Sequence, residues 1–298
     1  MIIRLASATV GLPLIIFVVW YGPPEQKLYW FTAFIFIVCV IATIETWLLV
    51  RRWTSVFHVG FPVILTAFMM IGAQTMAVES LDARPEGLYD RITRFYNEYL
   101  LAIVSCGLTY ILLITRNERA DEDDDAFSEY PKMRMRFPIT TTLAVSHYAA
   151  GFLFYAPMLR NLEQGREWVF LLLAVVFATD TSAYLVGRAI GKTPLAPNIS
   201  PNKTREGSVA GMVGAVAACV LANSLLGLNV IIWQALLLGA LIGALAQIGD
   251  LVESRLKRKA GVKDSGFLIP GHGGILDRID SIALAVPATY YFVIWIVQ

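Results

Sequence analysis

The sequence predicts an all-α, polytopic integral membrane protein with about nine transmembrane helices and a cytoplasmic N-terminus. Of its 298 residues, 57% are hydrophobic and only 16% are charged, whereas soluble domains carry about a quarter charged residues. A helix that crosses the hydrocarbon core needs ~20 mostly apolar residues, and nine segments meet that requirement. The distribution of Lys and Arg among the connecting loops gives the orientation.

The first predicted span follows a lone Arg4 and runs into the polar stretch WYGPPEQK. No small-residue cleavage site follows it, so we expect a retained helix and not a signal peptide. A short Gly-Leu-Asn turn is all that separates the seventh span from the eighth. In order, the nine spans are expected at roughly 5–22, 28–50, 55–78, 97–115, 137–158, 167–190, 208–228, 229–250 and 279–297.

The basic residues are unevenly distributed between the two sides of the predicted membrane. With a cytoplasmic N-terminus, 18 of the 24 Lys and Arg residues lie in inside loops and six lie outside. Cytoplasmic loops normally carry the excess of Lys and Arg. We therefore expect the N-terminus inside and the C-terminus outside.

The charge, cysteine and histidine content excludes several classes of function. A net charge of +1 gives no indication of nucleic-acid binding. The three cysteines stand alone in apolar spans, which favours buried packing. Only His272 is placed for chemistry, because His58 and His147 lie in predicted spans, and one histidine cannot form a zinc site. The acidic run in the 116–136 loop is interpreted as solvated charge.

The chain divides into residues 1–166, whose loops carry little chemistry, and residues 167–298, where polar groups enter the spans. The first of four polar clusters is ATDTSAY, with Asp180 inside an apolar helix. An ionised carboxylate at that depth costs at least ~2.5 kcal/mol. A salt bridge to Arg188 or Lys192 would explain it, but we favour a functional role. The use of Glu45, in the second span, is left open.

The second cluster is the loop SPNKTREG at 200–207, where Ser200, Lys203 and Thr204 precede a helix. Such a loop could hold phosphate oxygens at a helix N-terminus, although ordinary capping by Ser and Thr is the alternative. Gly207/Gly211 and Gly239/Gly243 have a four-residue spacing that lets helix backbones approach closely.

The third cluster is GDLVESRLKRK, in which Asp250 and Glu253 are three residues apart and share one helix face. Lys257, Arg258 and Lys259 follow, and a positive-inside anchor would explain these basic residues but not Asp250.

The fourth cluster is KDSGFLIPGHGGILDRIDS at 263–281. It contains another pair of acids three residues apart, Asp277 and Asp280, where the last span begins. Helix capping would explain one of them. The remaining polar and flexible residues of this cluster are Lys263, Gly271, His272, Gly273, Gly274 and Arg278.

Two carboxylate pairs mixed with Lys and Arg indicate a hard cation and phosphates, since Mg²⁺ prefers carboxylate and phosphate oxygens. Asp250 and Glu253 on one helix, with Asp277 and Asp280 on the next, could hold one or two ions. This chemistry favours phosphoryl or nucleotidyl transfer at the inner membrane face.

The run SRLKRKAGVKDSGFLIPGHGGILDRID resembles the signature of phosphatidate cytidylyltransferases (CDP-diglyceride synthases). The upstream pieces DTSAYLVGR, LAPNISPNKTREG and GDLVES are also similar in order and spacing, so the resemblance covers roughly 167–298. Asn202 and Arg205 depart from the family, where Lys and Trp are expected. The signature's fixed positions are filled by Ser254, Lys257, Arg258, Lys263, Asp264, Pro270, His272, Gly273, Gly274, Asp277, Arg278 and Asp280.

The resemblance implies the reaction of CTP with phosphatidic acid to give CDP-diacylglycerol and pyrophosphate. It also implies an all-helical membrane enzyme that is commonly a homodimer, with Mg²⁺ and a second cation such as K⁺. We expect residues 1–166 to be a scaffold with dimer contacts and 167–298 to be catalytic. The location expected is the bacterial cytoplasmic (inner) membrane, with the active site facing the cytoplasm.

On this basis each polar residue receives an expected role. Catalytic residues are Asp277, Asp280, His272, Lys263 and Asp264. Residues that contact nucleotide or phosphates are Ser200, Lys203, Thr204, Ser254, Lys257, Arg258, Gly273, Gly274 and Arg278, together with Lys263. Metal ligands are Asp250, Glu253, Asp277, Asp280 and Asp180.

Two alternatives stay open. A CTP-using lipid or polyprenol kinase would share the metal and nucleotide but transfer the terminal phosphate. An ion or phosphate transporter would also use buried acids. However, transporters show paired, broken helices in two repeats, whereas the polar residues here crowd one half of the chain.

Overall fold

The structure is a computed structural model that describes residues 2–21, 27–50, 63–64, 66–67, 70, 148, 151–268 and 273–297. Almost all of its regular structure is helical. The elements are α1 (Ile2–Trp20), α2 (Lys27–Val50), α7 (Tyr155–Asn161), α8 (Gly165–Ile190), β1 (Pro194–Ala196), β2 (Ser200–Thr204), α9 (Arg205–Leu226), α10 (Ile232–Lys259), α11 (Leu276–Ala283), α12 (Ala285–Phe292) and the π-helical turn η3 (Val293–Val297).

Five described helical segments are long and apolar enough to cross a membrane, which confirms a mostly helical, membrane-spanning chain. They are Tyr29–Val50, Gly165–Ile190, Arg205–Leu226, Ile232–Lys259 and Leu276–Val297. Most of the predicted spans at 55–78 and 137–158, and all of 97–115, lie outside the described residues. The total of nine spans and the cytoplasmic N-terminus therefore stay predictions.

Two local features differ from the sequence-based expectation. The 191–204 loop contains a small antiparallel sheet, in which Pro194 of β1 pairs with Thr204 of β2, and Ala196 pairs with Ser200. Helix α10 continues to Lys259, beyond the predicted span at 229–250, because the polar sequence after Gly249 keeps good helix formers. The chain is therefore mostly, not entirely, helical.

Small residues allow α8, α9 and α10 to pack closely, as the glycine spacing predicted. A Cβ at Gly211 of α9 would lie 3.0 Å from the Thr179 carbonyl oxygen of α8. A Cβ at Gly239 of α10 would lie 2.9 Å from Val216 Cα of α9. Both glycine pairs thus lie in helix–helix contacts, and the prediction of close backbone approach is confirmed.

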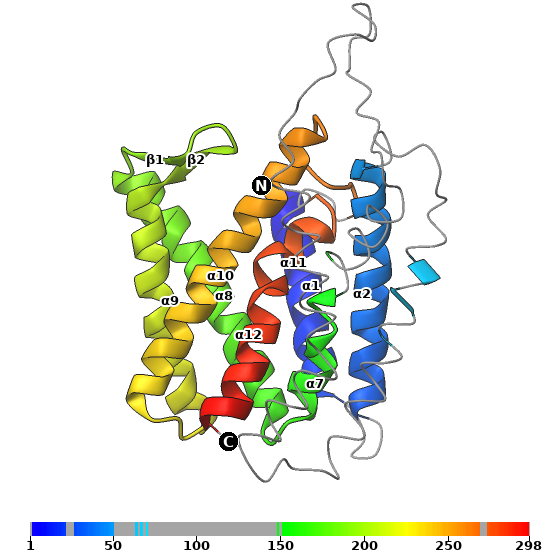
Figure 1. Cartoon of the computed structure of the whole chain (residues 1–298), viewed down its shortest axis with the longest axis vertical. Helices are drawn as coiled ribbons and strands as arrows, with labels where there is room; N and C mark the ends of the chain where they lie inside the picture. The colour runs from blue at the N-terminus through cyan, green and yellow to red at the C-terminus, as the bar shows by residue number, and fades with distance from the viewer. Residues whose placement is uncertain are drawn as a thin grey trace, which may run out of the picture.

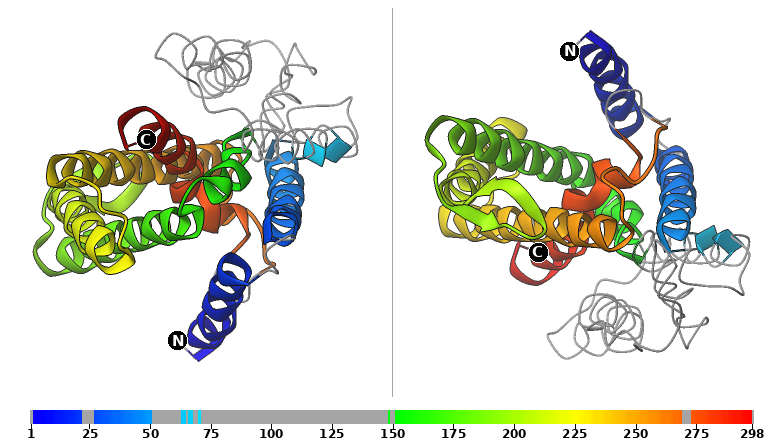
Figure 2. Two further views of the ribbon diagram at one scale, coloured as in Figure 1. Left: turned by 90° about the horizontal axis from the view of Figure 1, so that it is seen from below. Right: turned by 90° about the horizontal axis from the view of Figure 1, so that it is seen from above.

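The helices form two groups that meet along α11 and α12. Figure 1 shows α8, α9 and α10 on one side and α2 on the other, with α11 and α12 between them, and Figure 2 agrees from below and above. Buried Trp168, Leu276 and Tyr290 contribute to the shared apolar core. The β1–β2 hairpin and the C-terminal end of α10 lie at the same end of the molecule, opposite the C-terminus (Figure 1).

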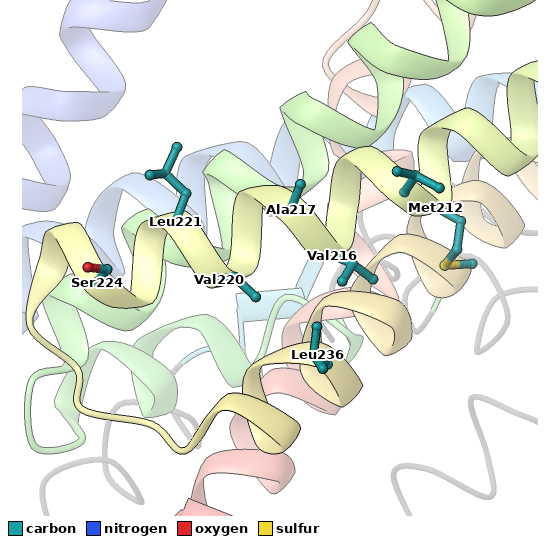
Figure 3. Close-up of a pocket in the computed structure, with 8 residues that line it drawn as sticks. Met212, Val216, Ala217, Val220, Leu221, Ser224 and Leu236 are labelled. Atoms are coloured by element: carbon teal, nitrogen blue, oxygen red, sulfur yellow. The ribbon is translucent and has the colours of Figure 1, made fainter.

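An open apolar groove of about 680 Å³ runs between α9 and α10 (Figure 3). Met212, Val216, Val220 and Leu236 line it, and Ser224 is its one polar side chain. None of the predicted site residues lines this groove. A lining of this kind suits hydrocarbon and cannot bind phosphates, so the candidate site lies elsewhere.

Candidate active site

Asp277 joins three parts of the chain at the first turn of α11. Its Oδ1 accepts a hydrogen bond from Lys257 Nζ of α10 at 2.5 Å. Its Oδ2 accepts from the backbone N of Ser265 at 3.0 Å, from Ser265 Oγ at 3.0 Å and from the backbone N of Gly274 at 2.8 Å. Because these donors come from α10 and from both sides of the preceding loop, Asp277 fixes the loop against α10.

Position 273, just before this contact, requires a glycine. Its φ is +82°, in the region that residues with a Cβ rarely adopt, and an added Cβ would collide with Asp277 Oδ2. The glycine thus allows the backbone to bend closely around the Asp277 carboxylate.

Lys257 lies between two carboxylates. Its Nζ is 2.5 Å from Glu253 Oε2, one helical turn earlier on α10, and 2.5 Å from Asp277 Oδ1. Glu253 is fully buried, and among the described residues its Oε1 meets no hydrogen-bond donor. Removing a carboxylate from water is costly unless it is paired, and Lys257 is shared between these two carboxylates.

Asp250, Asp180 and Asp280 form the other side of the acidic cluster. Asp250 on α10 pairs with Lys203 of β2 and accepts a hydrogen bond from Ser254 Oγ at 3.3 Å. Asp180 on α8 and Asp280 on α11 both lie near enough to Asp250 for like-charge repulsion. Carboxylates from three helices therefore lie close enough to influence one another electrostatically.

The cations that act on Asp180 are not those that the sequence suggested. Lys203 and Arg278 both attract the Asp180 carboxylate. Arg188, the partner considered from the sequence, donates instead to the Tyr184 hydroxyl at 3.0 Å. Asp180 thus belongs to the acidic cluster and not to a local ion pair on α8.

A close backbone contact brings Asp280 to this cluster. A Cβ at Gly249 would collide with the Asp280 carbonyl oxygen. Gly249 directly precedes Asp250, so α11 lies close against α10 beside the acids. Glu253 and Asp280 also repel each other electrostatically, in keeping with this proximity.

The residues at the β1–β2 hairpin that were expected to contact phosphates have different structural environments. Thr204 Oγ1 accepts a hydrogen bond from the backbone N of Gly207 at 3.1 Å, which is the capping that the sequence allowed as an alternative. Arg258 Nε donates to the Ile199 carbonyl at 3.2 Å and so holds the hairpin to α10. Ser200 begins β2 and is partly exposed.

The loop residues Lys263 and Asp264 have exposed side chains. His272 lies outside the described residues. Their expected roles stay predictions.

One contributor was missed by the sequence analysis. Glu45 of α2 is buried, and its carboxylate accepts hydrogen bonds from the backbone N of Ile275 at 3.1 Å and of Leu276 at 2.8 Å. The cost of burying an acid inside an apolar span, which singled out Asp180, applies equally to Glu45. That signal marked Glu45 as unusual but could not show what it contacts.

Comparison with known sequences identifies the family. The sequence model of the Cytidylyltransferase family matches residues 2–296, nearly the whole chain. The chain belongs to this family. The match extends through the first half, where the sequence motifs alone gave no resemblance.

Curated relatives of this cytidylyltransferase-family chain include phosphatidate cytidylyltransferases of several bacteria. It is 42% identical to that of Bacillus subtilis (strain 168) over 151 residues, which cover 50% of this chain and 56% of the relative. It is 45% identical to that of Brucella abortus (strain 2308) over 152 residues, 48% of this chain and 56% of the relative. The chain thus spans about half the length of the curated relatives it matches.

The family implies nucleotidyl transfer, and the acidic cluster can be tested for its fit to a metal ion. Within the described parts of the chain, no group of three or more His, Cys, Asp or Glu side chains is placed so that it could hold a metal ion. However, the buried Glu253 Oε1 has no donor there, and the nearby groups are oxygen donors of the kind that Mg²⁺ prefers. The residues therefore fit a hard divalent cation in chemistry, and the ligand assignments stay predictions.

Proposed function

We propose that this chain is a phosphatidate cytidylyltransferase, which converts CTP and phosphatidic acid into CDP-diacylglycerol and pyrophosphate in phospholipid biosynthesis. The observation that carries the proposal is the convergence of carboxylates from α8, α10 and α11 with Lys203 and Lys257. The family and the names of its relatives support this substrate class.

In this reaction an oxygen of the lipid phosphate attacks the α-phosphorus of CTP. A new P–O bond forms there, and the bond from the α-phosphorus to the bridging oxygen breaks, so the pyrophosphate leaves with that electron pair. A phosphate monoester loses its second proton at a pH of about 6, by analogy with phosphorylated side chains. The attacking oxygen is therefore already anionic, and no strong general base is needed.

The enzyme must align two anionic substrates and neutralise charge that develops on the α-phosphate and on the leaving pyrophosphate. Bound Mg²⁺, with a second cation such as K⁺, would supply the main positive charge. We assign its ligation to Asp250, Glu253, Asp277 and Asp280, and include Asp180 because Asp250 and Asp280 act on it electrostatically.

Basic and hydroxyl groups around the acids would hold the phosphates. Lys203 and Arg278 border Asp180, and Lys257 lies between Glu253 and Asp277. Fixed cations beside a transferring phosphoryl group act by charge and alignment. The further phosphate-contacting residues proposed are Ser200, Thr204, Ser254, Arg258 and Lys263, with Gly273 and Gly274 shaping the loop and Asp264 and His272 assisting.

For the whole protein we propose nine spans, with the N-terminus and the active site facing the cytoplasm of a bacterial inner membrane. The bias of Lys and Arg supports this orientation. We further propose that residues 1–166 act as scaffold and dimer interface and that 167–298 carry the catalytic groups.

The decisive experiment is an assay of the purified protein in detergent with phosphatidic acid, Mg²⁺ and each of the four nucleoside triphosphates. We expect pyrophosphate release, and formation of the nucleotide-linked lipid, with CTP only. Release of CDP with a newly phosphorylated lipid would instead indicate a lipid kinase. No turnover with any nucleotide, but phosphate or ion flux in liposomes, would indicate a transporter.

A further inference from the structure

We infer that Glu45 is a positioning residue, which holds the start of α11 and Ser265 so that Asp277 and Asp280 face α10. The inference rests on the proposed function for its kinetic consequences. Glu45 lies on α2, more than 200 positions before these residues, and belongs to none of the polar clusters of the second half.

The Glu45 carboxylate supplies the cap that α11 lacks. The first N–H groups of a helix have no partner within the helix, and Ile275, the residue before α11, gives no side-chain cap. Glu45 Oε1 accepts from Ile275 N at 3.1 Å, and Glu45 Oε2 accepts from Leu276 N at 2.8 Å. A negative charge at this end also suits the helix dipole.

A shared hydroxyl connects Glu45 to the acidic cluster. Ser265 Oγ lies 3.2 Å from Glu45 Oε2 and 3.0 Å from Asp277 Oδ2. The hydroxyl has one proton, so it can donate to only one of the two carboxylates at a time. A change at Glu45 therefore alters the hydrogen bonding of Asp277 directly.

The glycines of the loop are shaped around this carboxylate. A Cβ at Gly274 would collide with Glu45 Oε2 and Ser265 Oγ, and a Cβ at Gly266 would lie 2.5 Å from Glu45 Oε1. Two glycines of the polar segment thus make room for an acid that comes from the other half of the chain. With a shorter side chain, or an amide in place of the carboxylate, the loop would lose this fixed point.

Glu45→Gln tests the inference with little change in volume. A Gln amide can accept from only one of the two backbone N–H groups, because its NH₂ is a donor. We expect kcat to fall about 10- to 100-fold, from the loss of a charge-assisted hydrogen bond. We also expect a higher Mg²⁺ concentration at half-maximal rate, and faster amide hydrogen exchange at Ile275 and Leu276.

Thr46→Val is the matched control. Thr46 is the next residue of α2 and is also buried, but its hydroxyl donates to the Ala42 carbonyl within the same helix at 2.7 Å. This variant should keep the wild-type kcat, Mg²⁺ dependence and exchange rates. A general loosening of α2 would affect both variants alike, whereas a positioning role affects Glu45→Gln alone.

Ser265→Ala tests the same contact from the loop, without altering α2. We expect a raised Mg²⁺ requirement in this variant and, in the double variant with Glu45→Gln, a loss smaller than the product of the single losses. If Glu45→Gln does not yield folded protein, the Mg²⁺ dependence of Ser265→Ala decides, and a wild-type value would overturn the inference.

The inference and the proposed function can fail separately. Pyrophosphate release by the wild type, with unchanged kcat and Mg²⁺ dependence in Glu45→Gln, would overturn the positioning role alone. Without pyrophosphate release by the wild type the proposed function fails, and hydrogen exchange decides the inference. Faster exchange at Ile275 and Leu276 in Glu45→Gln would support the anchoring contact, and unchanged exchange would refute it.

Discussion

Replacement of Asp277 by Asn removes one negative charge from the candidate active site while almost preserving the volume of the side chain. In the native structure each oxygen of this carboxylate is used, Oδ1 by Lys257 and Oδ2 by Ser265 and Gly274. An Asn amide has one acceptor and one donor group. It can therefore satisfy only one of these two sides.

The geometry indicates which side is kept. If the amide oxygen faces the loop, the two backbone N–H groups keep their acceptor and the NH₂ meets the Lys257 ammonium. The opposite orientation would place the NH₂ group against two backbone N–H donors. It would leave both of them without an acceptor, whereas the first orientation leaves only the Lys257 ammonium without one. The variant therefore loses the bond to Lys257, at a cost of about 1.5–3 kcal/mol for a hydrogen bond to charged groups.

The catalytic effect should be larger than this loss of stability. Loss of one group aimed at charge that develops in the transition state typically lowers kcat by about 10²–10³-fold. We expect that range for Asp277→Asn, measured as pyrophosphate release in detergent, together with a raised Mg²⁺ requirement. Thermal unfolding followed by Trp fluorescence should show a folded protein with a somewhat lower midpoint.

Glu167→Gln is a suitable control, because it also removes one carboxylate charge with little change of shape. Glu167 lies in the first turn of α8, at the end opposite the hairpin, and pairs with Arg166 at 2.5 Å. We expect wild-type turnover. Wild-type turnover in Asp277→Asn as well would refute the assignment of Asp277 as a metal ligand. A lowered kcat with unchanged Mg²⁺ dependence would leave only its role in fixing the loop.

Three further predictions concern the same site. Gly249→Ala should destabilise the protein by about 1–3 kcal/mol through overpacking against the Asp280 carbonyl, seen as a lower thermal midpoint and reduced turnover; a wild-type midpoint would contradict the close contact. Lys203→Met should change stability by less than about 1 kcal/mol, because its pair with Asp250 is partly exposed. The KM of the Lys203→Met variant for CTP should nevertheless rise about tenfold if one charged phosphate contact is lost. An unchanged KM would exclude that contact. Chelation with EDTA should abolish pyrophosphate release and added Mg²⁺ should restore it, so activity that persists in EDTA would exclude a metal-dependent step.

Much of the site could be predicted because helical spacing is a local property. Asp250 and Glu253 do lie on one helix, α10, and Asp277 and Asp280 on the next, α11. The glycine pairs at four-residue spacing do lie in helix contacts. Each of these follows from the period of the α-helix, which neighbouring residues fix among themselves.

Other features depend on which helix faces meet. Lys257 bonds to Asp277 twenty positions away, and Glu45 bonds to Leu276 across 231 positions. The hairpin that brings Lys203 to Asp250 was expected as a loop. In each case the residues were visible in the sequence, but their partners were not.

The sequence by itself determined that this chain is a membrane-spanning helical member of a nucleotidyl-transferring family, with clusters of acidic and basic residues in its second half. Only the tertiary structure decided that α2 contributes a carboxylate to the start of α11 and that one lysine is shared between Glu253 and Asp277. The reason is physical: residue spacing fixes the direction of a side chain around its own helix, whereas its partner depends on how separate helices pack.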